Sequence, residues 1–273
     1  MDKLTIVKVG GAVVEDQAQL EQLLQHFTAI PGHKVLVHGG GRRATQVAAR
    51  LGIESKMVNG RRITDSEMLE VVTMVYGGLV NKNLVARLQA AGVNALGLTG
   101  ADMNVLRSRK RKPVTLQVRE EKSEDTRTCT VDFGYVGDVE QADGKRLQAL
   151  ILQGITPIMA PLTHHGEGHI LNTNADTIAA ETAKALAPYF DVTLVYSFEK
   201  PGVLRDANDD QSVIPLITRD DFARYVADGT VSGGMIPKIE NALNATAAGV
   251  KKVVITLATA IDGTQGTTIQ ENQ

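Results

Sequence analysis

The sequence predicts an α/β protein with a mostly parallel central sheet and helices on both faces. Short apolar runs alternate with helical patterns along most of the chain, and such alternation is typical of βαβ units. The first apolar run, from Leu4 to Val9, ends in glycine, which suits a parallel strand buried on both faces. A chain of 273 residues is long enough for one large α/β unit or for two closely joined lobes.

The expected elements follow one another with short connections. Strands are expected at residues 4–9, 35–37, 95–98, 156–160, 192–196 and 253–257. Helices are expected at residues 16–30, 42–51, 143–153, 174–186, 220–227 and 235–248, with a further long helix after Thr64. In the helix at 16–30, leucines and Phe27 recur on one face before Pro31 and Gly32 end the pattern.

The long helix is expected to begin with a capping box, in which Thr64 and Glu67 satisfy each other's backbone groups. Its middle contains Gly77 and Gly78, and glycines inside a helix usually have a packing reason. We therefore expect another helix to approach closely at this point.

Residues 102–140 have a different character, with short strand-like pieces and many charges. We expect β-hairpins here, laid over one end of the sheet. Five of the six residues at 107–112 are basic, but acidic side chains follow within twenty residues (Glu120, Glu121, Glu124 and Asp125). This balance favours a solvated hairpin over a nucleic-acid patch.

Composition excludes several classes of partner. Lys and Arg number 29 against 31 Asp and Glu, a net charge of −2, so we expect no nucleic-acid partner. No stretch of about 18 apolar residues occurs, and none is therefore expected to span a membrane. Cys129 is the only cysteine, and a strand pattern starts almost at the N-terminus. We expect a cytoplasmic protein without disulfide bonds or a signal peptide.

Two glycine-rich strand exits suggest a phosphate site. Lys8 is followed by Gly10 and Gly11, and a second strand ends in a glycine triplet at residues 39–41. Glycine allows close approach of a ligand, and the N–H groups of such loops point together at an anion. A single loop of this kind would be read as a tight turn, but two in tandem favour phosphate binding.

The second half of the chain adds polar residues at two helix starts. Asn172, Asn174 and Asp176 lie at a strand-to-helix junction, where they suit either an N-cap or a small ligand. Lys238 lies in the first turn of the helix at 235–248, at the unfavourable end of the helix dipole. An anionic ligand explains this lysine better than stability does.

Several motifs that mark other classes of enzyme are absent from the sequence. The chain has no Walker P-loop, no G-x-G-x-x-G after the first strand and no G-x-S-x-G, which counts against dehydrogenases and serine hydrolases. The histidines and the glutamate at 164–169 lie in a glycine-broken turn where neighbouring side chains point apart. We predict no metal site there.

With these motifs, the chain resembles the amino acid kinase family, in the branch that phosphorylates acylated glutamate. The matching pieces cover nearly the whole length: residues 8–11, 38–41, 59–64, 98–100, 134–138, 172–176 and 234–238. The resemblance implies an open three-layer αβα sandwich. It also implies one continuous fold with an N-terminal lobe (1–170) for acylglutamate binding and dimerisation and a C-terminal lobe (171–273) for ATP.

Site roles are implied by the same resemblance. Lys8 and Lys238 correspond to the phosphate-stabilising cations, and Asp176 to the group that holds them in place. Backbone groups for the phosphoryl group correspond to Gly10, Gly11, Gly40 and Gly41. Substrate-binding positions are Gly40, Gly41, Arg62, Asn172 and Asn174; nucleotide-binding positions are Ser197, Gly202, Val203, Leu204, Gly234 and Met235.

The implied reaction is ATP-dependent phosphorylation of the γ-carboxylate of N-acetyl-L-glutamate, a step of arginine biosynthesis, with Mg²⁺ bound to ATP. A carboxylate with an ordinary pKa of about 4.3 is already ionised at neutral pH, so it needs no general base. Repulsion between two anions is the obstacle, and lysines, N–H groups and Mg²⁺ reduce it. Two lysines without a base therefore favour a carboxylate acceptor.

Three alternatives stay open. The first is the same reaction on N-succinyl-L-glutamate, for which Arg61 and residues 107–112 offer extra positive charge. The second is a non-catalytic nucleotide or amino-acid sensor, against which the joint presence of Lys8, Asp176 and Lys238 argues. The third is a sibling kinase acting on free glutamate, aspartate, carbamate or UMP. Asn172 and Asn174 with Arg62 favour the acylglutamate branch over it.

Two departures from the family pattern matter. The loop from Ser197 to Leu204 is one residue longer than the usual Thr-Asp-Val-Pro-Gly-Val-Leu and lacks its Asp, which leaves adenine recognition open. Arginine-inhibited members carry an extra N-terminal helix, whereas here Lys8 lies close to the start. We therefore expect a homodimer joined through the helix after Thr64, without arginine feedback.

Overall fold

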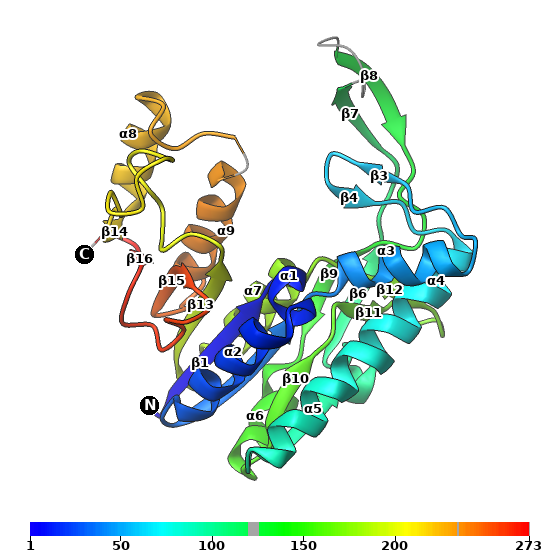
Figure 1. Ribbon diagram of the computed structural model, residues 1–273, viewed down its shortest axis with the longest axis horizontal. Coiled ribbons are helices and arrows are strands. Elements are labelled where there is room, and N and C mark those ends of the chain that lie inside the picture. Colours follow the sequence, from blue (N-terminus) through cyan, green and yellow to red (C-terminus); the bar gives the residue numbers. More distant parts are fainter. Residues whose placement is uncertain (120–125, 234, 273) are drawn as a thin grey trace.

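A computed structural model describes residues 1–119, 126–233 and 235–272. An eight-stranded sheet forms its centre, in the order β14-β16-β15-β13-β1-β2-β10-β5 (Figure 1). The strands are β1 (Lys3–Val9), β2 (His33–His38), β5 (Ala95–Leu98), β10 (Thr156–Met159), β13 (Asp191–Phe198), β14 (Leu216–Ile217), β15 (Lys252–Leu257) and β16 (Thr267–Ile269). Neighbours pair in parallel except β15 with β16, which confirms the predicted parallel sheet.

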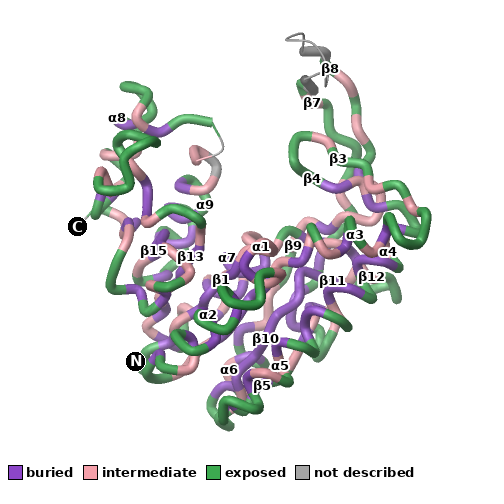
Figure 2. Tube along the Cα trace, in the orientation of Figure 1, coloured by how far each residue is buried: buried purple, intermediate pink, exposed green. Residues whose placement is uncertain are grey.

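Helices cover both faces of this sheet, as predicted. Leu4 and Ile6 of β1 pack into the core on one face, and Val7 and Val9 into the core on the other, because side chains alternate along a strand. The first face carries α6 (Gly144–Leu152), α7 (Ala175–Leu186), α8 (Arg219–Ala227) and α9 (Met235–Ala247). The second carries α1 (Gly11–Glu15), α2 (Gln17–Ala29), α3 (Gly41–Arg50), α4 (Ser66–Val72) and α5 (Asn81–Ala90). Most of the buried residues lie between the central sheet and the helices on its two faces (Figure 2).

The long helix after Thr64 is not a uniform α-helix. A π-helical segment, η1 (Thr73–Val80), joins α4 to α5. The predicted capping box is wrong, because Asp65 is the N-cap and its side chain accepts from the Met68 N–H at 2.9 Å. A helix was expected to approach Gly77; instead a Cβ there would lie 3.5 Å from Leu162, a residue of a strand.

Smaller sheets lie at one end of the central sheet. Four strands pair in the order β12 (Ile170–Asn172), β11 (Leu162–His164), β6 (Leu106–Lys110) and β9 (Gly137–Ala142), beside the 3₁₀ turn η2 (Asp102–Asn104). Two hairpins rise beyond them, β3 (Met57–Val58) with β4 (Arg61–Arg62) and β7 (Val114–Arg119) with β8 (Thr126–Val131) (Figure 1). This confirms hairpins over one end of the sheet.

The basic run at 107–112 is solvated as expected, since four of its five basic residues are exposed, but it belongs to a four-stranded sheet rather than to a separate hairpin. Most of it lies in β6, between β9 and β11. Arg109 faces Glu140 at 3.7 Å and Arg111 pairs with Asp138, so acids of the neighbouring strand provide the balance. The acidic side chains at 120–125 lie outside the described residues. Within the described ranges, no helix has both the length and the apolar character needed to cross a membrane.

Candidate functional site

The two glycine loops lie against each other. Because β1 and β2 pair in parallel, with Val9 opposite His38, both loops leave the same edge of the sheet. The Gly39 N–H donates to the Val9 carbonyl at 3.0 Å. A Cβ on Gly39 would lie 3.0 Å from the Gly11 nitrogen, and one on Gly11 would lie 3.3 Å from the Gly40 nitrogen. Side chains are therefore excluded where the backbones meet.

A buried histidine supports the second loop. The Nδ1 atom of His38 lies 2.8 Å from the Gly39 carbonyl, and its Nε2 atom lies 3.1 Å from the Asn81 amide nitrogen. Since a carbonyl accepts and an amide nitrogen donates, the proton of a neutral imidazole belongs on Nδ1. Burial lowers the pKa of His38 to about 4, against the opposing effect of the Gly39 hydrogen bond. Asn81 also donates to the Ile158 carbonyl at 2.8 Å.

Tyr76 of η1 closes the loop from the other side. A Cβ on Gly40 would lie 3.0 Å from a ring carbon of Tyr76. Burial raises the pKa of the Tyr76 hydroxyl, although the neighbouring Arg62 charge opposes this rise. The π-helical segment thus positions Tyr76 on the glycine loop at 39–41, and Asn81 follows at its end.

Lys8 and Asp176 form an ion pair at the centre of the site. The Lys8 Nζ atom lies 2.6 Å from Asp176 Oδ1, and the lysine side chain is 11% exposed. Asp176 is placed by the N-terminus of α7, where the Asn174 side chain accepts from the N–H groups of Asp176 and Thr177 at 2.8 and 3.2 Å. The Tyr196 hydroxyl donates to the Asp176 carbonyl at 3.3 Å.

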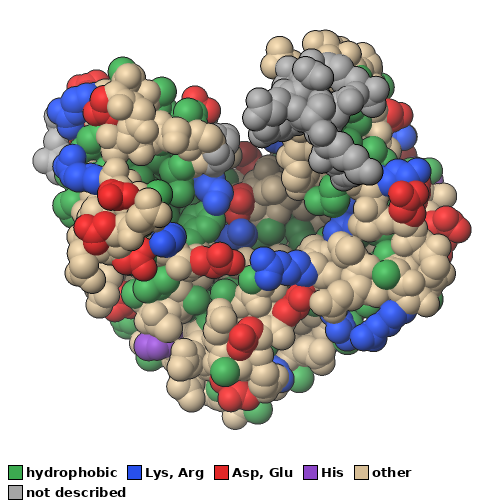
Figure 3. All heavy atoms as spheres, turned by 45° about the horizontal axis from the view of Figure 1, so that its top comes forward, with side chains coloured by type: hydrophobic (Ala, Val, Ile, Leu, Met, Phe, Trp, Pro, Cys, Tyr) green, Lys and Arg blue, Asp and Glu red, His purple; other side chains and the backbone are tan. Residues whose placement is uncertain are grey.

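Lys8 and Lys238, from opposite ends of the chain, line one cavity of about 570 Å³. Lys238 and Gly41 also line an adjoining cavity of about 560 Å³ that contains Asp176. Together they form the cleft seen in Figure 3, with charged side chains at its floor. Burial and the Lys8 charge lower the pKa of Lys238, while Asp176 and Glu199 act in the opposite direction.

The cavity with both lysines also contains the predicted phosphate-binding residues Gly10 and Gly11. Of the predicted nucleotide-binding residues, Ser197, Gly202 and Met235 line it. The buried Ser197 Oγ has no hydrogen-bond partner within the described part of the chain. Such an orphaned hydroxyl fits a site that is completed by a ligand. Gly202 leaves no room for a side chain, because a Cβ there would lie 2.7 Å from Thr267 Oγ1.

Two of the predicted nucleotide-binding residues, Val203 and Leu204, do not line this cavity. Val203 is buried in the core, and its N–H donates to Thr267 Oγ1 at 2.8 Å. Leu204 forms an isolated bridge with Val213, and neither residue is part of the lining of the two cavities. Gly234 lies outside the described residues.

The adjoining cavity gathers the predicted substrate-binding residues Gly40, Gly41, Arg62, Asn172 and Asn174. Arg62 is buried and donates to the Gly41 carbonyl at 2.8 Å, to Thr45 Oγ1 at 2.9 Å and to Ser55 Oγ. It also donates to Met68 Sδ at 3.8 Å. A guanidinium has five N–H donors, so one is left after these four bonds.

The two asparagines each have a structural partner as well. The Asn172 amide nitrogen donates to Thr64 Oγ1 at 2.9 Å, which leaves its carbonyl oxygen for the cavity. The Asn174 oxygen caps α7, so the N-cap alternative applies to this residue even though it lines the cavity.

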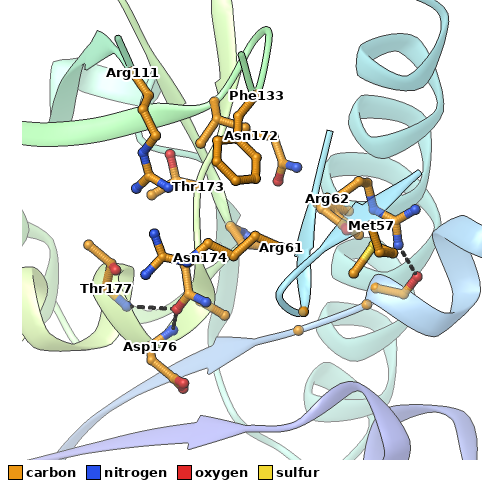
Figure 4. A pocket seen from close by; sticks show the side chains of 18 of the residues that line it. Met57, Arg61, Arg62, Arg111, Phe133, Asn172, Thr173, Asn174, Asp176 and Thr177 are labelled. Carbon is orange, nitrogen blue, oxygen red and sulfur yellow. Dashed lines mark hydrogen bonds between the residues drawn. The ribbon is translucent and has the colours of Figure 1, made fainter. Parts of the chain in front are cut away.

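Two more arginines point into this cavity. Figure 4 shows Arg61 and Arg111 reaching toward Asn174 from opposite sides. Arg111 donates through Nε to Asp138 at 2.9 Å and lies 5.8 Å from the Phe133 ring. Arg61 and the basic residues at 107–112 are the candidates for binding a larger, charged acyl group. Among them, Arg61 and Arg111 line the cavity.

Sequence reasoning missed the aromatic residues of the site: Tyr76, Phe133 and Phe198. Phe198 ends β13 much as Lys8 lies near the end of β1, but its ring reaches the cavity through the register of these two strands, which the sequence does not give. Tyr76 had no usable signal, since its position depends on the π-helical winding of η1.

Comparisons with known proteins agree with this geometry. A family model described as the amino acid kinase family matches residues 3–257. The chain belongs to the amino acid kinase family. A curated relative from Bacteroides thetaiotaomicron, named acetylglutamate kinase, is 66% identical over 99% of both chains.

Solved structures of related proteins have the same fold. The protein smu.665 from Streptococcus mutans superposes with a TM-score of 0.71 at 28% identity, covering 98% of both chains. Carbamate kinase from Giardia lamblia bound to AMP-PNP superposes with a TM-score of 0.64 at 16% identity, covering 99% of both chains. At this second identity the likeness shows the fold alone.

The neutral state of His38 predicts a specific loss of stability in acid. At pH values between the folded pKa of about 4 and the unfolded pKa of about 6.5, the His38 imidazole is protonated in the unfolded chain but stays neutral in the folded chain. The free energy of unfolding should therefore fall by about 2 kcal/mol from this residue alone between pH 7 and pH 5. Urea unfolding at both pH values measures it.

The His38→Gln variant should lose less stability between these pH values than the wild type does. His26→Gln changes an exposed histidine and serves as the matched control. Its stability should differ between the two pH values by as much as that of the wild type. An unchanged pH dependence in His38→Gln would show that His38 is not held neutral.

Proposed function

We propose that this protein transfers the γ-phosphoryl group of ATP to the γ-carboxylate of N-acetyl-L-glutamate, a step of arginine biosynthesis. The observation that carries the proposal is the convergence of Lys8 and Lys238 on one cavity, with Asp176 paired to Lys8. It is supported by the relative named acetylglutamate kinase, which matches the chain over nearly its whole length.

The reaction needs no proton transfer from the acceptor. A γ-carboxylate oxygen forms a bond to the γ-phosphorus, and the bond from that phosphorus to the β,γ-bridging oxygen breaks. ADP leaves with the electron pair. The product is an acyl phosphate.

The residues around the transferred group would act through charge and position. Lys8 and Lys238 offset the negative charge on the phosphoryl oxygens, and Asp176 holds Lys8 in place. The N–H groups of Gly10, Gly11, Gly40 and Gly41 donate to the same oxygens. The interlocked glycine backbones fit this role because no side chain would separate them from a phosphate.

Mg²⁺ would be bound to the phosphates of ATP, where it neutralises charge. Within the described residues, no group of three or more His, Cys, Asp or Glu side chains is arranged to hold a metal ion. The chain's own contribution is therefore the lysines and the glycine N–H groups.

Substrate binding is assigned to the two cavities. Arg62, through its remaining N–H group, would hold the α-carboxylate, and Asn172 the acyl-amino group, with Asn174 beside it. Ser197, Gly202 and Met235 would contact the nucleotide. Val203 and Leu204 belong to the same predicted nucleotide-binding set and follow Gly202 in the sequence, and Gly234 directly precedes Met235. In this assignment residues 1–170 form most of the acylglutamate lobe and residues 171–273 most of the ATP lobe. Asn172 and Asn174 lie beyond that boundary, and Gly10 and Gly11 before it, so each cavity takes residues from both lobes.

A second acceptor, N-succinyl-L-glutamate, is favoured by one observation. Arg61 and Arg111 both line the acylglutamate cavity and reach toward Asn174 (Figure 4). An acetyl group has no charge to pair with them, whereas the carboxylate of a succinyl group does.

We further propose a homodimer joined through the helix after Thr64. Met74 and Leu79 of η1 are 54% and 41% exposed, and Leu96 of β5, the last strand of the sheet, is 38% exposed. Large exposed apolar side chains of this kind mark association surfaces, and most homo-oligomers are two-fold dimers.

Removing either lysine should abolish most turnover. We expect Lys8→Ala and Lys238→Ala to lower kcat by about 100- to 1000-fold, the range for loss of one preorganised transition-state donor. Asp176→Asn should lower it less, because Lys8 remains. Hydroxylamine trapping of the acyl phosphate, with ADP release, measures the rate. Lys145→Ala on the exposed side of α6 is the control, and full turnover in Lys238→Ala would refute the assignment.

Acyl specificity separates the two acceptors. We expect turnover of N-acetyl-L-glutamate, with kcat/KM little changed in Arg61→Gln and Arg111→Gln. A higher kcat/KM for N-succinyl-L-glutamate, falling about 10-fold or more in these variants, would establish the second acceptor instead. Inactivity of the wild type on both compounds would remove the kinase proposal.

Sedimentation velocity tests the dimer. The wild type should sediment with about twice the chain mass of 29.2 kDa, and Met74→Asp should shift it toward the monomer because burying a carboxylate at the interface is unfavourable. Leu51→Asp, at an exposed leucine after α3, is the matched control. A wild-type monomer at micromolar concentration would contradict the proposal.

A further inference from the structure

Phe198 occupies a special place in the site. It is the last residue of β13, the strand that pairs with β1 and places Tyr196 opposite Lys8. Its ring packs against the core and lines the cavity that contains both lysines. This is the position at which the chain has Phe where the family pattern has Asp.

Both lysines contact the ring of Phe198. The Lys238 Nζ atom lies 3.9 Å from the ring centroid and the Lys8 Nζ atom 5.9 Å from it. A cation within about 6 Å of an aromatic face is attracted by the ring quadrupole, and most strongly at short distance. Lys238 is therefore the lysine that the ring holds.

The charges around the two lysines differ. Lys8 has Asp176 at 2.6 Å, whereas Lys238 has no carboxylate within 4.0 Å among the described residues. The charged groups that act on Lys238 are Asp176 on α7, Lys8 on β1 and Glu199 after β13. Burial and the Lys8 charge both disfavour its ammonium form. An aromatic face offsets part of this cost.

A neutral ring has an advantage over a carboxylate here. A carboxylate would bind the ammonium strongly, compete with the phosphate for it and repel the incoming nucleotide. The ring attracts the cation without adding a negative charge, so the ammonium stays available to an anion.

We propose that Phe198 is a positioning residue for Lys238: its ring face holds the lysine ammonium at the phosphate site before the nucleotide binds. The contact itself is a property of the ligand-free protein. Its effect on turnover rests on the proposed function.

NMR of the ligand-free, full-length protein tests the contact without any activity assay. With ¹³C-labelled lysine, the Lys238 ε-protons should be shifted upfield by the ring current, and Lys238→Met assigns their signal. The shift should disappear in Phe198→Leu and persist in Phe198→Tyr. Phe222→Leu is the matched control, because Phe222 of α8 packs on the same core cluster but is not part of the cavity lining. An unshifted Lys238 signal in the wild type would overturn the proposal.

The same samples give the pH titration of Lys238. Loss of the ring in Phe198→Leu should move its titration to lower pH, because a contact that favours the ammonium is gone while Asp176, Glu199 and Lys8 remain. Phe198→Met, which keeps most of the volume, repeats the test if the leucine variant melts early. A titration unchanged in both variants would mean that the ring does not hold the charge.

Kinetics then test the consequence for catalysis. We expect Phe198→Leu to lower kcat/KM for ATP by about 3- to 30-fold, the range that corresponds to one cation–π contact. The basic limb of its pH profile should move to lower pH, which a purely structural role would not produce. The KM for the acylglutamate should change little.

The outcomes separate this inference from the proposed function. A ring-current shift in a wild type that phosphorylates no acylglutamate would leave the contact standing and remove the function. An active wild type with normal kinetics in Phe198→Leu and Phe198→Met would leave the function standing and overturn the positioning role.

Discussion

The ion pair between Lys8 and Asp176 joins the two halves of the chain at the point where the chemistry is proposed. It connects the end of β1 to the first turn of α7 at 2.6 Å. A largely buried lysine needs a counter-charge, and a carboxylate near a helix N-terminus is favoured there. The Asn174 cap fixes this carboxylate in turn, so the geometry of the cleft depends on a helix cap as much as on the lysine.

Around this pair, the cationic groups are supported in different ways. Lys8 has a carboxylate, Lys238 an aromatic face and Arg62 a set of neutral oxygens. Each support suits a different task. A permanent carboxylate fixes a cation firmly, while neutral partners leave more of its charge for an incoming anion.

Most of the fold could be predicted from the sequence. The long parallel strands are apolar and bounded by glycine, so their positions follow from local pattern. Short elements such as β14 and β16, of two and three residues, carry too little pattern and form only because neighbouring strands pair with them. The acids that pair with the basic run at 107–112 could not be predicted for a similar reason, since they lie on β9 and are distant in sequence.

The site was predictable where a residue's role depends on its backbone position, as for Lys8, the glycine loops and the junction at Asn172 to Asp176. It was not predictable where the role depends on tertiary packing. Phe198, Tyr76 and Phe133 reach the cleft because of strand register and helix winding. The glycine pair at 77–78 predicted the close approach of another element, but nothing in the local pattern predicted the π-helical form of η1.

The winding of η1 has a consequence for how this fold tolerates length changes. An α-helix turns by about 100° per residue, and the π-helical segment holds extra residues in its wider turns. Deleting one residue between Thr73 and Val80 would take up this surplus and leave the flanking α-helices nearly in phase. The same deletion within α5 (Asn81–Ala90) has no surplus to take up, and it would rotate every later side chain by about 100°. The contact between Asn81 and His38 beneath the glycine triplet is therefore better protected against loss of a residue from η1 than a regular α-helix would make it.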